Sequence, residues 1–328
     1  MAADSLIEWT DHTFNLWYGC ARESPACRNC YADPIANRFG GSLARSAATR
    51  LVSAGAEPGT PLNLWRRHGP RLILSEHNAR KPLAWNRAAK RAGVPARVFC
   101  SSMSDVFEQH PVLEVNAELD AERARLWKII EQTPWLRWQL LTKRIDLVSE
   151  MVPWGNSWPA NVWIGTSVET MKFADQRIPE LLKLPAKIRF LSCEPMLEEL
   201  DLHRYLGCWR RTPTGAFTAS AIDWVIAGGE SGPQARPMHP EWVRGLRDQC
   251  SAYRVPYFFK QRGEWTWEAP AGDWSDPQLY VDRTTRKTVD RESEITAGGS
   301  WTGVWRTGRK RAGRLIDGQF HNAFPEAA

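Results

Sequence analysis

The chain has 328 residues, of which 43% are hydrophobic and 24% are charged, as in an ordinary globular protein. This composition excludes a disordered chain, a collagen and a small disulfide-rich scaffold. No run of 18 apolar residues is present, so we expect no membrane span, and the first residues lack the pattern of a secretory signal. We therefore expect a cytoplasmic protein whose seven cysteines stay reduced, which favours metal binding or catalysis over disulfides.

Three cysteines near the N-terminus, Cys20, Cys27 and Cys30, have the spacing C-x6-C-x2-C. The close pair can direct two thiolates to one point, and the break at Ser24-Pro25 lets the chain return so that Cys20 joins them. Three thiolates can hold a [4Fe–4S] cluster with one iron open to S-adenosylmethionine. They can also belong to a structural zinc site, which needs a fourth ligand from elsewhere in the chain. Three unligated cysteines are the third interpretation.

Short apolar runs rich in β-branched and aromatic residues follow, and each ends abruptly in polar residues. Runs of this kind predict strands buried on both faces: 97–100, 138–141, 162–165, 188–191, 224–227 and 255–259. Apolar residues at helical spacing between them predict helices over 119–130, 178–184 and 242–250. With weaker strands near 14–16 and 72–74, the pattern predicts an α/β fold, a full or partial (β/α) TIM-like barrel. A doubly wound open sheet is the alternative.

The polar residues that end these strands are the candidate site, because chemistry gathers at the carboxyl ends of parallel strands. Their carboxylates suit acid–base work or binding of a ribose or amino group, and their cations suit phosphate or carboxylate. We assign four of them to catalysis: Lys143, Cys193, Glu194 and Glu230. We assign four others to cofactor binding: Asp105, Arg144, Glu169 and Lys260. Ordinary turn, capping or packing roles are the alternative.

After residue 262 the pattern changes, which predicts a barrel-like domain over 1–262 and a β-rich C-terminal extension over 263–328 that packs on it. The segment 306–314 carries five cations and no acid, and the whole chain has 18 tryptophans and a net charge of +6. DNA or RNA is therefore a possible partner, although such a run is more often a solvated surface. The tryptophans in predicted loops are candidates for base stacking: Trp154, Trp158, Trp265, Trp267, Trp274 and Trp301. Four others are expected in the core: Trp127, Trp138, Trp163 and Trp224.

Seven segments, in the same order along the chain, resemble those of the phage-derived three-cysteine-motif family, which is largely described as a domain of unknown function. They are 7–11, 19–32, 102–107, 141–144, 165–169, 190–195 and 228–232. The resemblance runs from about residue 5 to about residue 325, and it implies a protein of phages, prophages or bacteria with no established reaction. Members often occur beside a separately encoded partner, which the resemblance implies here as well.

The predicted architecture is also similar to radical S-adenosylmethionine enzymes, which have a partial (β/α) barrel and three cysteines after an early strand. This likeness implies a [4Fe–4S] cluster on Cys20, Cys27 and Cys30. Those enzymes usually have C-x3-C-x2-C spacing, whereas six residues fill the first gap here. The Gly-Gly-Glu at 228–230 follows a late strand, whereas theirs follows the second, so its role is not carried over.

The first hypothesis is therefore an iron–sulfur enzyme of the radical S-adenosylmethionine type that acts on a nucleic acid or a nucleotide. The second is a nucleic-acid-binding protein that zinc stabilises and that has no catalytic activity. The third is an interaction module that acts with a separately encoded partner protein.

Overall fold

The computed structural model divides into two compact units, each described by itself below. The first comprises Met1–Gly165 and Lys183–Lys187, and the second comprises Thr166–Leu182 and Ile188–Ala328. The residues that the structure describes are 5–36, 38, 49–53, 63–207, 210–211, 217–218, 222–270, 276–290, 292–296 and 298–325. The domain boundary after residue 262 stays a prediction.

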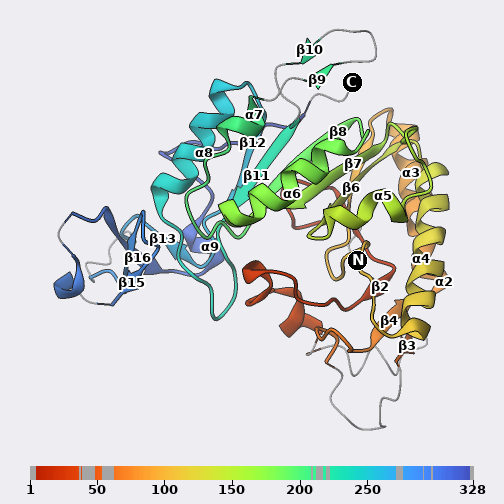
Figure 1. The fold of residues 1–328 in the computed structure, drawn as a ribbon, viewed down its shortest axis with the longest axis horizontal. Coiled ribbons are helices and arrows are strands. Elements are labelled where there is room, and N and C mark those ends of the chain that lie inside the picture. Colours follow the sequence, from red (N-terminus) through yellow and green to blue (C-terminus); the bar gives the residue numbers. More distant parts are fainter. Residues whose placement is uncertain are drawn as a thin grey trace. The chain divides into compact units, whose positions relative to one another are not determined.

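A seven-stranded sheet has the strand order β1-β5-β6-β7-β8-β11-β12 (Figure 1). Its strands are β1 (His12–Phe14), β5 (Ala96–Cys100), β6 (Leu136–Thr142), β7 (Val162–Ser167), β8 (Ile188–Cys193), β11 (Trp224–Gly228) and β12 (Tyr257–Gln261). The pairs β1–β5 and β5–β6 of the first unit and β8–β11 and β11–β12 of the second are parallel. Every residue of β7, β8 and β11 is buried, which explains their continuous apolar runs.

The α/β class and all six predicted strands are thereby confirmed. The strand order follows the chain without a reversal, whereas a doubly wound sheet reverses its order at a switch point, so that alternative is wrong. Closure into a barrel stays a prediction.

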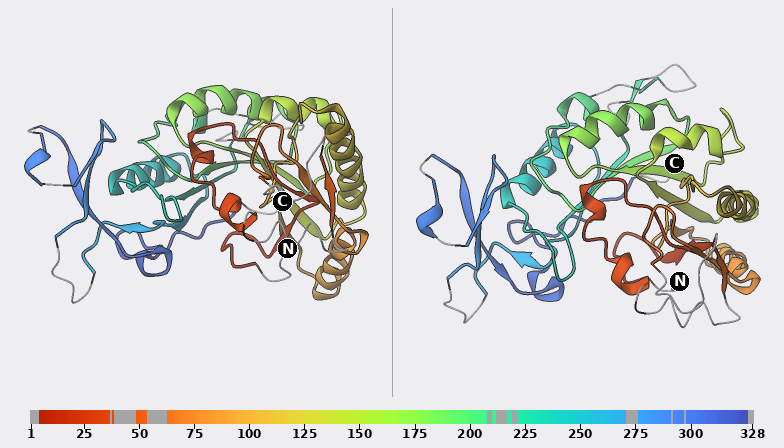
Figure 2. Two further views of the ribbon diagram at one scale, coloured as in Figure 1. Left: turned by 90° about the horizontal axis from the view of Figure 1, so that it is seen from below. Right: turned by 60° about the horizontal axis from the view of Figure 1, so that its bottom comes forward.

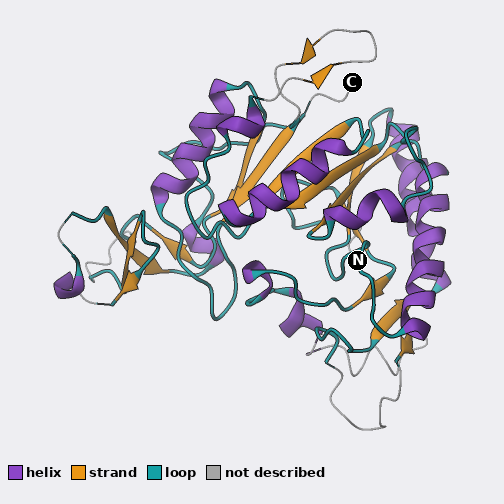
Figure 3. Cartoon of the chain, in the orientation of Figure 1, coloured by secondary structure: helices purple, strands orange, loops and turns teal. Residues whose placement is uncertain are grey.

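Helices alternate with these strands, as Figure 3 shows. The long ones are α3 (Lys81–Ala92), α4 (Leu113–Glu131), α6 (Met171–Lys183) and α8 (Pro240–Ala252). In α4, the buried Leu119, Leu126 and Ile130 recur at helical spacing, and in α8 Pro240 occupies the first turn, where its missing N–H costs nothing. The shorter ones are α2 (Glu76–Ala79), α5 (Val148–Met151) and α7 (His203–Leu206). Among the described residues, no helix has the length and apolar character that crossing a membrane requires.

The first unit contains a second, antiparallel sheet that the sequence did not predict. Its strands are β2 (Trp17–Tyr18), β3 (Thr49–Val52) and β4 (Arg71–Leu74), in the order β2-β4-β3. The predicted strand near 72–74 therefore exists as β4, but it does not belong to the parallel sheet. The other weak strand, near 14–16, corresponds to β1, which lies two residues earlier in the chain (His12–Phe14).

The end of the second unit is rich in β-structure, as the sequence predicted for 264–304. It forms the four-stranded sheet β13-β16-β14-β15, which is blue in Figure 2. Its strands are β13 (Trp265–Thr266), β14 (Leu279–Asp282), β15 (Thr288–Val289) and β16 (Trp301–Arg306). The short helix α9 (Arg309–Ala312) follows, and the two-stranded pair β9 (Arg210–Arg211) and β10 (Phe217–Thr218) lies earlier in the chain.

The tryptophans divide between core and surface largely as predicted. Those expected in the core are 5% exposed or less: Trp127, Trp138, Trp163 and Trp224. Trp265 is also buried, in β13, and its indole donates to Ala235 O at 2.7 Å, so its prediction as an exposed stacking residue is wrong. Trp154 and Trp158 are half-buried and pack against each other. Trp274 lies outside the described residues.

Candidate functional site

The three cysteines lie on one loop of the first unit, between β2 and the helical residues 32–36. Cys27 ends the one-turn 3-10 helix η1 (Pro25–Cys27), and its backbone N–H donates to Ser24 O at 2.9 Å. The Ser24-Pro25 break therefore makes the turn that the sequence predicted. Cys20, Cys27 and Cys30 are all partly exposed.

N–H groups point at the sulfur atoms of Cys20 and Cys27. The Arg144 guanidinium donates from Nη1 to Cys20 Sγ at 3.7 Å, and the Glu23 backbone N–H donates to Cys27 Sγ at 3.5 Å. A thiol sulfur is a weak acceptor, whereas a thiolate is a strong one that gains from N–H donors and nearby cations. Both sulfurs therefore have an N–H donor within reach, and the Cys20 thiol itself donates to Ala21 O at 3.2 Å.

Cys30 has the same kind of surroundings at the start of a helix. Its sulfur accepts hydrogen bonds from the backbone of Ala32 and Asp33, and these bonds oppose the rise that burial produces in its pKa. The Lys143 ammonium also lowers the pKa of Cys30, and a charged Cys27 raises it. Burial is the largest effect and leaves the pKa of Cys30 raised, while the cation and the backbone N–H groups partly offset it.

Cys20 is the most strongly shifted thiol of the three. Burial raises its pKa, and the negative charges of Glu108 and Asp105 raise it further, while Arg144 opposes them. A charged Cys27 also raises the pKa of Cys20. Cys27 is therefore close enough to both other cysteines for like-charge repulsion, and three thiolates would need a cation among them.

Asp105 and Arg144 form a buried ion pair beside Cys20. Arg144 Nη1 lies 2.9 Å from Asp105 Oδ2, and both residues are buried. Arg144 Nη2 donates to Ala21 O at 2.9 Å and lies 3.0 Å from Glu23 Oε1. The guanidinium thus joins the end of β6 to the start of the cysteine loop.

The Asp105 carboxylate also accepts hydrogen bonds from the loops that surround it. Its carboxylate accepts hydrogen bonds from Thr142 Oγ1 at 2.8 Å, from the Phe107 N–H at 3.0 Å and from the Lys143 N–H at 3.2 Å. Asp105 therefore fixes the loops that follow β5 and β6 and holds Arg144 in place.

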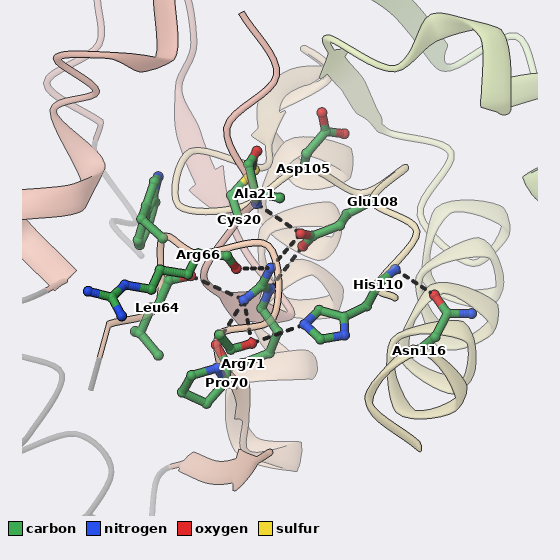
Figure 4. Close-up of polar contacts among 12 residues, drawn as sticks. Cys20, Ala21, Leu64, Arg66, Pro70, Arg71, Asp105, Glu108, His110 and Asn116 are labelled. Atoms are coloured by element: carbon green, nitrogen blue, oxygen red, sulfur yellow. Dashed lines mark hydrogen bonds and ion pairs between the residues drawn. The ribbon is translucent and has the colours of Figure 1, made fainter. Parts of the chain in front are cut away.

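Glu108 and Arg71 are site residues that the sequence analysis missed (Figure 4). The two side chains are 1% and 0% exposed, with Arg71 Nη2 2.5 Å from Glu108 Oε1 and Nε 3.0 Å from Oε2. Glu108 Oε1 also accepts the backbone N–H of Ala21 at 2.9 Å. Arg71 Nη1 donates to Leu64 O at 3.2 Å, and Leu64 O also accepts the backbone N–H of Cys20 at 3.1 Å.

Gly19 is required where the cysteine loop approaches Arg71. Its φ of +113° lies in a region that L side chains rarely adopt. A Cβ there would lie 2.8 Å from Arg71 Cδ and 2.9 Å from Leu64 O. The backbone before Cys20 therefore packs directly against the side chain of Arg71 and the backbone of Leu64.

The structure thus brings six predicted site residues into one neighbourhood of the first unit: Cys20, Cys27, Cys30, Asp105, Lys143 and Arg144. Within the described part of the chain, no three Cys, His, Asp or Glu side chains are arranged to hold a metal ion as they stand. The metal and its type therefore stay predictions.

In the second unit, Glu194 and Lys260 form an ion pair at the carboxyl ends of β8 and β12. Lys260 Nζ lies 2.8 Å from Glu194 Oε1 and 3.0 Å from Oε2. Gln261 Nε2 donates to Glu194 Oε1 at 3.1 Å and to Ser231 Oγ at 2.9 Å. Gly228 packs against the Glu194 carboxyl group, where a Cβ would lie 3.2 Å away. Two predicted residues and two neighbours therefore share one polar group.

Glu230 and Glu169, the other predicted carboxylates of this unit, are each paired with an arginine. Glu230 binds Arg236 through Oε1 and Oε2, at 2.5 and 2.8 Å. Glu169 is fully buried, and its Oε2 accepts from Arg177 Nη1 at 2.9 Å. Such pairing is typical of structural ion pairs as well as of active sites.

Cys193 is fully buried at the end of β8. Burial raises the pKa of its thiol, and the charges of Cys250 and Glu169 raise it further. A thiol in this state stays protonated at neutral pH, so it is a poor nucleophile but can still donate a hydrogen atom.

The basic run of the second unit is partly engaged with its own chain. Arg306 Nη2 donates to the carbonyl groups of Gly232 and Pro233 at 3.1 and 2.5 Å. Arg314 donates to Phe259 O at 3.3 Å. The exposed cations of α9 are then the better candidates for a polyanion: Arg309, Lys310 and Arg311.

Comparison with known proteins gives a family. A family model described as a protein of unknown function, DUF5131, matches residues 4–325. The chain belongs to this family. The match includes the cysteine loop and the polar groups of both units, and it confirms that the chain belongs to a family without an assigned function, while the phage origin and the likeness to radical S-adenosylmethionine enzymes stay predictions. No curated protein matches the chain.

Proposed function

We propose that the chain is an iron–sulfur enzyme of the radical S-adenosylmethionine type that acts on a nucleic acid or a nucleotide. Cys20, Cys27 and Cys30 would hold the [4Fe–4S] cluster. The observation that carries the proposal is that each of the three sulfur atoms accepts at least one N–H hydrogen bond. Thiolate ligands of iron–sulfur clusters are stabilised and tuned by such bonds.

The donor set fits this group chemically. The three thiols lie on one loop, and Cys27 interacts by charge with both others. Because thiolates in such proximity repel one another, their joint ionisation needs a bound cation, and metal binding supplies one while releasing the thiol protons. Cys20, Cys27 and Cys30 would leave one iron of such a cluster free for S-adenosylmethionine, and the cluster would supply an electron for reductive cleavage of that cofactor.

The place of the loop in the fold also supports the proposal. In parallel α/β folds, cofactors bind at the carboxyl ends of the strands. The cysteine loop follows β1 and β2, Asp105 follows β5, and Lys143 and Arg144 follow β6. We infer a partial (β/α) barrel of the kind that the resemblance implies, with strands added in chain order.

In the first unit, the chain's own residues would then hold charge around the cofactor. Lys143 and Arg144 place positive charge beside Cys30 and Cys20. In the second unit, the paired Glu194 and Lys260 can exchange their mutual contact for polar groups of a substrate or cofactor, since each is already held at a strand end. Glu169 and Glu230 are further candidates for binding and acid–base roles, and Cys193 is a candidate hydrogen-atom donor.

Anaerobic purification with metal and sulfide analysis tests the proposal. We expect a brown protein that contains iron and acid-labile sulfide and that consumes S-adenosylmethionine after reduction. Cys27→Ser should remove the metal, whereas the matched control Cys100→Ala should keep it, because Cys100 is buried in β5 and its sulfur contacts Ser101. A colourless protein with bound zinc would favour the non-catalytic alternative, and equal metal content in Cys27→Ser would exclude the cysteine loop as the metal site.

A further inference from the structure

Two buried arginines hold the backbone and the sulfur at Cys20. The N–H of Cys20 donates to Leu64 O, which Arg71 also contacts. The N–H of Ala21 donates to Glu108, which is paired with Arg71. The second arginine is Arg144.

Arg144 contacts two atoms of the same dipeptide from the other side. Its Nη1 donates to Cys20 Sγ at 3.7 Å and its Nη2 donates to Ala21 O at 2.9 Å. Asp105, 2.9 Å from Nη1, fixes the orientation of the guanidinium. Among the described cysteines of the loop, Cys27 and Cys30 accept N–H groups of the backbone, whereas Cys20 accepts a hydrogen bond from a charged side chain.

We propose that Arg144 is a positioning residue that orients the Cys20 sulfur toward the cluster and raises the reduction potential of the cluster through its charge. The proposal rests on the proposed function. A cluster that gains an electron becomes more negative, so a fixed cation and an N–H···S bond stabilise the reduced form more than the oxidised one. The Arg144 side chain is 7% exposed, so water screens its charge only weakly.

This role differs from that of a clamp for a substrate anion. Arg144 already contacts Asp105, Glu23, Ala21 and the Cys20 sulfur, which together use both terminal nitrogens of its guanidinium. A phosphate or carboxylate would have to displace these contacts and the buried carboxylate of Asp105. The arrangement therefore suits a permanent contact with the Cys20 sulfur better than reversible binding of a substrate.

Arg144→Gln and Arg144→Lys separate charge from geometry. Gln removes the charge, so the midpoint potential of the cluster should fall. Lys keeps the charge but cannot reach Asp105, Ala21 and Cys20 together, so its potential should stay near that of the wild type. Both variants should lose iron to a chelator about 10-fold faster or more, as substitutions next to metal ligands typically do. Arg97→Gln removes a cation from the ion pair with Asp11 and should change neither property.

The order of measurements distinguishes the two proposals. Iron and sulfide are first measured in the wild-type protein, and their absence would overturn both the proposed function and this inference. If the wild type holds the cluster, a wild-type potential and a wild-type rate of iron loss in Arg144→Gln would overturn the inference alone. If Arg144→Gln fails to fold, Arg144→Lys decides, because iron loss at the wild-type rate in that variant contradicts the positioning role.

Discussion

Replacement of Glu108 by leucine is expected to destabilise the first unit through the charge that it leaves behind. Arg71 is 0% exposed, and Glu108 is the acid that pairs with it, at 2.5 Å. Removal of one partner of a buried ion pair costs about 3–5 kcal/mol, because the other charge remains buried without compensation. The Ala21 N–H also loses its acceptor, which adds about 1–3 kcal/mol. This loss is a large share of the about 5–15 kcal/mol that stabilises a typical domain.

The double variant Arg71→Met/Glu108→Leu tests this reasoning, because it removes both charges. Most carbonyl groups that Arg71 contacts have a second partner: those of Leu64, Arg66 and Gly69. Pro70 O, 3.0 Å from Arg71 Nη1, would lose its donor at a cost of about 1–3 kcal/mol. The charge penalty of about 3–5 kcal/mol disappears, so the double variant should be more stable than Glu108→Leu by about 2 kcal/mol.

Urea denaturation followed by tryptophan fluorescence measures the free energies of unfolding. Hydrogen exchange at the amides of residues 20–21 and 71–74 shows whether the loss falls on the cysteine loop and β4. If the two single substitutions simply add in the double variant, the pair has no coupling, and the assignment of the loss to an uncompensated buried charge is wrong.

Three further perturbations have defined outcomes. Burial raises the pKa of Cys20 and Cys30 in the folded, metal-free protein. Their contribution to stability is therefore present below about pH 8.5, where the thiols of the unfolded chain ionise, and it falls at higher pH. The urea midpoints of the wild type and of Cys20→Ser/Cys30→Ser should converge as the pH rises above this value. Gly19→Ala should destabilise the metal-free protein by about 1–3 kcal/mol in the same assay. Neutralising Arg309, Lys310 and Arg311, the cations of α9, should weaken polyanion binding and reduce its salt dependence. Fluorescence anisotropy across a salt series measures both. Unchanged midpoints or an unchanged salt slope would contradict the respective prediction.

The sequence predicts the parallel sheet well because its signal is local. A strand buried on both faces must be apolar along its length, and β7, β8 and β11 are buried at every position. Polar residues at the ends of such strands are then expected near one another, which is why Asp105, Lys143 and Arg144 could be selected without a structure. The three cysteines and their spacing, not the strand pattern, supplied the choice of iron–sulfur chemistry.

The buried pair of Arg71 and Glu108 could not be selected in the same way. Arg71 begins β4, and an arginine before an apolar run normally reads as a residue that is exposed at the end of a strand. Its burial depends on a carboxylate 37 residues away and on carbonyl groups of the preceding turn. One local signal is available: Glu108 lies in the same segment after β5 as Asp105, so it was an equally good candidate for a site residue.

The antiparallel placement of β4 and the burial of Trp265 have the same cause. An apolar run specifies that a strand is buried but not which strand pairs with it, so residues 72–74 fitted the parallel sheet equally well. Trp265 lies in a two-residue strand, too short for a periodic pattern, and its burial follows from pairing with β16. Partners distant in sequence decide both cases.

Charge around the cysteine loop gives a last prediction. Lys143 acts by its charge on Cys30 and lowers the pKa of that thiol, against the rise that burial produces. A metal centre with three thiolate ligands carries net negative charge, for zinc as for a [4Fe–4S] cluster, and Lys143 complements it.

Lys143→Glu should therefore weaken metal retention, whereas Lys143→Arg, which keeps the charge, should preserve it. The rate of metal loss to a chelator measures this for either metal, and the effect should shrink as salt is added, because Lys143 is only half-buried. Equal rates of metal loss in the two variants at low salt would mean that the charge beside Cys30 does not act on the metal. The charge argument for a thiolate centre at this loop would then lose its support, while the hydrogen bonds to the three sulfurs would still require an explanation.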